Sequence, residues 1–214
     1  MNDIYENNMK FLPLLKFLER NKLIIISLIV FLVLVISYFV ASNQITKKKN
    51  AEASIIYGSF LEEISSTNPD HSVLNNALNN LLEDYGSSGY TQIALMNKAN
   101  LDAKNNNLEE SLKNFERLVN ITDGYSGNKI FNKIARVSAS RIMFSEGRYD
   151  EALKMIEKFS SNSSNGYIHE LTGDILFKQN KPDLAKAQYE LASEKYDDEN
   201  SKYIILMKIA VIGK

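Results

Sequence analysis

Residues 173–192 read GDILFKQNKPDLAKAQYELA, and their spacing predicts two packed helices joined by a tight turn. Five packing positions follow one another at intervals of 3, 9, 4 and 3 residues. The first four alternate between small and large apolar residues, and the five are Gly173, Leu176, Ala185, Tyr189 and Ala192. The small residues allow two helices to approach closely, and the large residues fill the space between them. Between the halves lies Gln179-Asn180-Lys181-Pro182, where Asn suits a helix end and Pro a helix start.

The same spacing occurs twice more, upstream. One copy is Ser140, Met143, Ala152, Ile156 and Phe159, and the other is Ala99, Asp102, Ser111, Phe115 and Leu118. The turn signals Glu146-Gly147-Arg148 and Asn105-Asn106-Asn107 lie between the halves of these copies. Because no strand pattern interrupts them, the sequence predicts an all-α solenoid of helical hairpins.

Apolar residues at helical spacing flank the repeats. Upstream, helical periodicity over 51–65 breaks at Thr67-Asn68-Pro69-Asp70 and resumes from Val73 to Leu82, which predicts a further hairpin. Downstream, Ser201 to Ile212 is too apolar for a fully solvated helix. It either packs under the last repeat, which we favour, or offers a docking surface.

A membrane span precedes the predicted solenoid. Residues 23–41 read LIIISLIVFLVLVISYFVA, without a charge, and as a helix they would cover roughly 28 Å, close to the hydrocarbon thickness of a bilayer. A cleaved signal peptide is the alternative, but its apolar region would have to be unusually long. We therefore expect a tail at 1–22, a transmembrane helix at 23–41, a juxtamembrane linker at 42–50 and the repeat domain at 51–214. Lys and Arg near the span leave its orientation open.

The composition limits the class of partner. Residues 51–214 hold 18 basic and 23 acidic side chains, a formal charge of −5, which disfavours nucleic acid as a partner. The chain has no cysteine, which excludes disulfides, zinc–cysteine sites and thiol catalysis. His71 and His169 lack neighbours at metal or triad spacing, so we expect both to be structural or exposed. We expect no catalytic residue, no metal site and no cofactor.

The repeat pattern resembles the tetratricopeptide repeat. Gly173, Leu176, Ala185, Tyr189 and Ala192 match that family's alternation of small and bulky residues, and residues 146–152 look like its inter-helix turn. The resemblance implies a concave groove formed by the first helix of each hairpin, with partner-binding side chains one turn along from the packing positions. These would be Met96, Asn100, Val137, Arg141, Phe144, Glu170, Asp174 and Phe177.

The whole layout also resembles the YfgM family, an ancillary subunit of the bacterial SecYEG translocon. The likeness is carried by stretches at 4–7, 17–22, 135–137, 173–177 and 206–209, which read IYEN, FLERNK, ARV, GDILF and LMKI. It implies an inner-membrane protein with a cytoplasmic N-terminus and a periplasmic C-terminal domain. Its expected partners are the SecYEG translocon, a membrane-anchored periplasmic chaperone and exported client proteins.

This resemblance implies a scaffold and not a catalyst: the domain would help exported proteins pass to periplasmic chaperones. The alternative function is a tetratricopeptide adaptor for envelope biogenesis or cell division, anchored in the same way but bound to different partners. A fold fixes a groove and not its ligand, so the sequence leaves both functions open.

Overall fold

The computed structural model describes residues 13, 16–125, 127–160, 163 and 165–212, which form helices and no strand. The chain divides into two compact units, Met1–Ala51 and Glu52–Lys214. The helices are α2 (Lys22–Ile64), α3 (His71–Tyr85), α4 (Gly89–Lys104), α5 (Leu108–Thr122), α6 (Lys129–Ser145), α7 (Tyr149–Ser160), α8 (Gly166–Lys178), α9 (Pro182–Lys195) and α10 (Glu199–Ile212). The predicted all-α class is confirmed.

Most of helix α2 lies in the first unit. It contains an 18-residue window with a mean hydropathy of 3.2, none of it buried, so by length and composition it could cross a membrane. Residues 42–50, the expected juxtamembrane linker, are also helical. The IYEN stretch at 4–7, which carried part of the resemblance to YfgM, lies outside the described residues.

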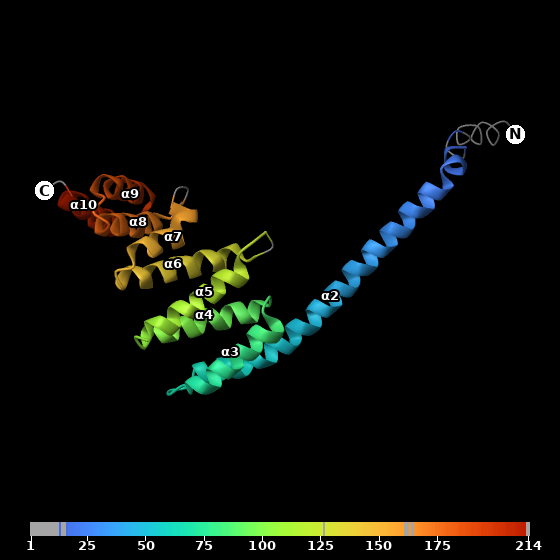
Figure 1. Cartoon of the computed structure of the whole chain (residues 1–214), viewed down its shortest axis with the longest axis horizontal. Helices are drawn as coiled ribbons and strands as arrows, with labels where there is room; N and C mark the ends of the chain where they lie inside the picture. Colours follow the sequence, from blue (N-terminus) through green and yellow to red (C-terminus); the bar gives the residue numbers. More distant parts are fainter. Residues whose placement is uncertain (1–12, 14–15, 126, 161–162, 164, 213–214) are drawn as a thin grey trace. The chain divides into compact units, whose positions relative to one another are not determined.

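The second unit is a stack of helical hairpins. Figure 1 shows α3 to α10 following one another in chain order, and each of these helices packs mainly against its neighbours in sequence. Helices α4 and α5, α6 and α7, and α8 and α9 form the three predicted hairpins. The end of α2 and α3 supply the further hairpin expected upstream, and the carboxylate of Asp70 caps α3 by accepting from the backbone N–H groups of Ser72 and Val73.

Packing between the hairpin helices follows the predicted positions. The small residues of all three hairpins are buried, as are the large residues Phe115, Ile156 and Tyr189. Phe159 is only partly buried. At Gly173 the two helices approach closely, because a Cβ there would lie 2.5 Å from Cε1 of Tyr189. The first helix therefore needs a residue without a side chain at this point.

All three inter-helix turns end their first helix in the same way. Asn106, Gly147 and Asn180 adopt φ angles of 63°, 77° and 61°, in the left-handed region that Gly and Asn tolerate. The residue after each donates its N–H back to a carbonyl five residues earlier in chain order, at 2.8–3.0 Å, as in a Schellman motif. The prediction of left-handed helix ends is thus confirmed at every turn.

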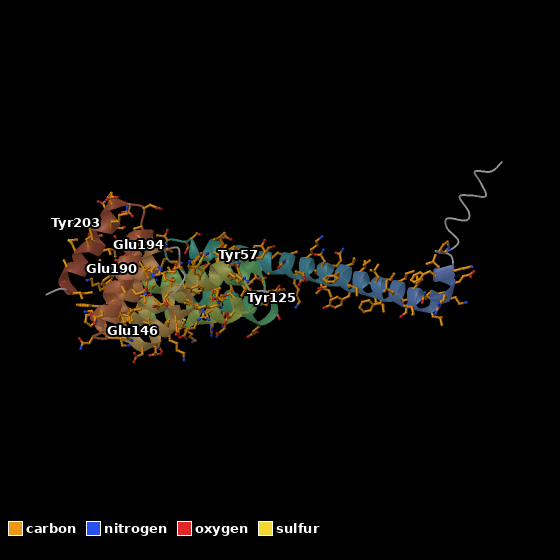
Figure 2. All side chains as sticks on the ribbon, turned by 90° about the horizontal axis from the view of Figure 1, so that it is seen from above. Tyr57, Tyr125, Glu146, Glu190, Glu194 and Tyr203 are labelled. Atoms are coloured by element: carbon orange, nitrogen blue, oxygen red, sulfur yellow. The ribbon has the colours of Figure 1, made fainter. Side chains whose placement is uncertain are left out.

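Helix α10 buries one face and exposes another. Ile205 is fully buried beside Leu176, Tyr189 and Ala192, so the helix packs on the last hairpin as we favoured. Its opposite side leaves large apolar side chains in solvent, among them Tyr203, which lies at the outer edge of the helix in Figure 2.

Candidate partner-binding groove

Two of the hollows that border helix α6 lie between it and a neighbouring hairpin. The first, of about 270 Å³, lies between α6 and the α4–α5 hairpin and is lined by Asn100, Ala103, Leu108, Phe115, Ser138, Arg141, Ile142 and Ser145. The second, of about 590 Å³, lies between α6, the end of α7 and the start of α8. We call it the α6 pocket. Its lining residues are Lys129, Ile130, Lys133, Ile134, Val137, Ser138, Phe159, Asn165, Tyr167 and Ile168.

Three of the eight predicted groove residues line these hollows. Asn100 and Arg141 share the first, and Val137 lines the second. Ser138 lines both, so the hollows meet along one side of α6. The structure therefore brings residues of neighbouring hairpins together, as the groove hypothesis requires.

Met96 and Phe144 lie in neither hollow. Both are partly buried against the hydrophobic core, and the ring of Phe144 lies 5.7 Å from that of Tyr149. Their contacts within the domain explain why they are less accessible than Arg141. Phe177 on α8 is exposed and also lies outside both hollows.

Glu170 and Asp174 are held by contacts within the chain. Lys208 of α10 donates to Glu170 Oε1 and to both carboxylate oxygens of Asp174, each at 2.7 Å. Tyr189 donates its hydroxyl to Asp174 at 2.8 Å, and Tyr196 donates to Glu170. Both acids are partly buried, and helix α10 supplies the cation that neutralises them.

We call Glu170, Asp174, Tyr189, Tyr196 and Lys208 the C-terminal cluster. Its contacts shift the pKa values of the two tyrosines and of the lysine. Burial raises the pKa of Tyr189 and of Tyr196 above the ordinary value, and the carboxylate that each hydroxyl faces adds to the shift. Burial alone would lower the pKa of Lys208, but its bonds to Asp174 and Glu170 outweigh that effect and raise it. The cluster therefore favours a protonated lysine and protonated phenols.

The sequence reasoning missed the apolar side chains that border the α6 pocket. Ile130 and Ile134 are 72% and 41% exposed and lie four residues apart on α6, in line with Val137 and Arg141. A signal for them was present: the stripe at helical spacing continues toward the N-terminus from Val137. Tyr167 was also missed, and the guanidinium carbon of Arg141 lies 5.8 Å from its ring centre.

A buried charge pair lies in the first hairpin. The side chains of Lys98 and Asp102 are only 3% and 1% exposed, and Lys98 Nζ donates to both carboxylate oxygens at 2.6 and 2.7 Å. Asn114 donates to the same carboxylate at 3.1 Å, and His71 Nδ1 lies 3.9 Å from it. Asp102 stands where the other hairpins have Met143 and Leu176, so this cluster replaces an apolar contact.

His169 is a structural residue, as expected. It is buried, its Nδ1 lies 2.9 Å from Gln188 Oε1, and its Nε2 lies 3.1 Å from the carbonyl of Ser163. Within the described ranges, no group of three or more His, Asp or Glu side chains is arranged to hold a metal ion. His71 is the first residue of α3.

Stacked hairpins with hollows between their first helices define a helical-repeat interaction domain. The chain belongs to the tetratricopeptide repeat-like domain family, whose model matches residues 16–214. Repeats of this kind typically serve protein–protein interaction and not catalysis. No curated protein matches the chain.

Two solved structures share the fold. Both contain nearly identical TPR-like repeats of a protein described as a putative kinesin light chain from Podosopora anserina, and one of the two is a point variant of the other. The TM-scores are 0.54 for the variant and 0.53 for its parent, and each likeness has 12% identity and covers 78% of this chain and 84% of the other.

Proposed function

We propose that this protein is a membrane-anchored interaction scaffold that works beside the SecYEG translocon and helps exported proteins pass to a membrane-anchored periplasmic chaperone. The observation that carries the scaffold role is the pair of hollows along α6, on a domain that follows an apolar helix. A tethered groove raises the local concentration of its partners near the membrane.

The translocon assignment is supported by the order of the sequence stretches that resemble YfgM. Three of them lie on α6, α8 and α10, the helices that border the hollows or hold the C-terminal cluster. In this arrangement residues 23–41 contact the lipid bilayer, the N-terminus is cytoplasmic and the repeat domain is periplasmic.

Photocrosslinking in intact cells tests this proposal. A photoreactive residue replaces Arg141, which borders the first hollow, and a second variant carries it at Leu184. Leu184 is a matched control because it is 57% exposed on α9 and lines neither hollow. Mass spectrometry then identifies the adducts of each variant.

We expect adducts with translocon subunits, a periplasmic chaperone or exported chains from position 141 and not from position 184. Adducts with proteins of envelope biogenesis or cell division would instead support the alternative adaptor. Adducts confined to cytoplasmic proteins would overturn both the orientation and the translocon assignment.

A further inference from the structure

The α6 pocket has an apolar floor, of which Ile130 and Ile134 are the most exposed part. Ile130 and Ile134 project from α6, Phe159 comes from α7, and Tyr167 and Ile168 come from α8, the neighbouring helices in Figure 1. At about 590 Å³ the pocket has room for more than one large side chain. Such a cavity would bind an apolar anchor from a partner more readily than a purely polar segment.

The charged side chains of this pocket all have one sign. Lys129 and Lys133 line it, Arg141 stacks on Tyr167 at its edge, and no Asp or Glu is among the lining residues. None of the three cations forms an ion pair with a described carboxylate; Lys133 Nζ instead lies 5.9 Å from the ring centre of Phe159. This arrangement is unexpected in a domain whose formal charge is −5.

The acid of the adjacent hollow already pairs with other cations. Asp123 lines the adjacent hollow with Lys129 and Phe159, and it pairs with Arg136 at 3.3 Å and with Lys158 at 3.1 Å. Lys158 contributes most to holding the pKa of Asp123 below its ordinary value, followed by the backbone N–H of Gly124, and Arg136 contributes least. Asp123 is therefore not free to balance Lys129 and Lys133.

Two helix N-termini add to the positive potential. Lys129 is the first residue of α6, and Asn165 is the N-cap of α8. Both line the pocket, and the partial positive charge of a helix macrodipole is concentrated at this end. The apolar floor and the cationic rim together define the chemistry of a complementary ligand.

We propose that the α6 pocket binds a protein segment in which large apolar side chains are flanked by Asp or Glu. The apolar side chains insert between Ile130, Ile134 and Tyr167, and the acids face Lys129, Lys133 and Arg141. This proposal rests on the scaffold function and names the partner chemistry that one part of the groove selects.

Binding of labelled peptides to the full-length chain in nanodiscs tests the proposal. The probe is a fluorescein peptide with a Leu-Phe pair flanked on each side by two Asp, and the comparison peptide has Lys in place of every Asp. Ile130→Ser and Lys133→Glu alter the pocket, and Leu184→Ser and Lys186→Glu make the same changes on α9, at exposed positions outside it. Since Ile130 is mostly exposed, its replacement is not expected to unfold the domain.

We expect the Asp peptide to bind the parent protein at least on the order of tenfold more tightly than the Lys peptide, and more weakly as salt is raised. Ile130→Ser and Lys133→Glu are each expected to weaken binding on the order of fivefold to tenfold, and the α9 controls by less than twofold. Circular dichroism of each variant verifies that the helices remain.

Equal binding of both peptides, or equal effects of pocket and control variants, would overturn the proposal. Binding of anionic lipid nanodiscs that competes with the peptide would assign the cationic rim to lipid instead. The scaffold function is tested separately by the crosslinks from position 141. Partner adducts without selective peptide binding would refute only the pocket chemistry, and selective binding without translocon adducts would refute only the translocon assignment.

Discussion

Replacing Asp102 by Ala is expected to lower the free energy of unfolding by about 3–5 kcal/mol. The carboxylate and Lys98 are both buried, and their contacts of 2.6 and 2.7 Å leave no room for solvent between them. Removing the acid leaves an ammonium group inside the domain without a counter-charge. Asn114 also loses the acceptor of its amide.

A compensated replacement is expected to behave differently. Changing Lys98, Asp102 and Asn114 together to Met removes both charges of the pair and the amide that bonds to it. The middle hairpin already has methionine at two of these positions, since Met143 corresponds to Asp102 and Met155 to Asn114. Methionine adapts to irregular space, so the triple variant should be within about 2 kcal/mol of the parent or more stable. The contrast isolates the cost of the unpaired charge from the cost of changed packing.

Urea unfolding of the full-length chain in detergent, followed by far-ultraviolet circular dichroism, measures these differences. The single variants Lys98→Met and Asp102→Met, together with the double variant that carries both changes, form a cycle that gives the coupling energy between the pair. A loss below about 1 kcal/mol for Asp102→Ala, typical of an exposed ion pair, would refute the reasoning. So would a triple variant as unstable as the single one.

Three further predictions concern backbone approach and pH. Gly173→Ala is expected to destabilise the last hairpin by about 1–3 kcal/mol, because its Cβ would overlap the buried ring of Tyr189; calorimetry measures the loss, and an unchanged melting temperature would contradict the close contact. Gly58→Ala in α2, where nothing beyond the neighbouring residues and the local helix backbone lies within 4 Å of the new Cβ, is expected to stabilise by about 0.5–1 kcal/mol in the same measurement, and a loss would contradict it. Since the folded-state pKa values of Tyr189, Tyr196 and Lys208 are raised, their stabilisation is complete below the ordinary tyrosine value of 10.0 and is lost as pH rises above it. Phenolate absorbance and hydrogen exchange should therefore show the C-terminal helices opening at alkaline pH before the other hairpins, and simultaneous opening of all hairpins would contradict this.

The repeat geometry was predictable because local spacing determines it. Ala99, Ser140 and Gly173 occupy the same position in three successive hairpins, and the residue at that position must be small whatever surrounds it. The left-handed helix ends were predictable for the same reason, since Asn and Gly carry that preference in the sequence itself.

The charge clusters could not be predicted in this way. Lys98 and Asp102 lie four residues apart on one helix, so their pairing is a local feature, but only the folded hairpin shows that the pair is buried and bonded to Asn114. Lys208 reaches Glu170 and Asp174 from a helix more than thirty residues away. Such contacts depend on how α10 lies on α9, which the periodicity of neither helix specifies.

The hydroxyls of Ser111 and Ser140 have a mechanical consequence. Ser111 on α5 donates to the carbonyl of Ala99 on α4 at 2.7 Å, and Ser140 on α6 donates to the carbonyl of Ala152 on α7 at 2.8 Å. The two bonds run in opposite chain directions but join equivalent points, so each of these two hairpins is fixed where its helices cross. Sliding of one helix along the other would break a buried bond, whereas rotation between successive hairpins would not. Flexing of these two hairpins under load is therefore concentrated at the joint between them, where the first hollow along α6 would widen or narrow with it.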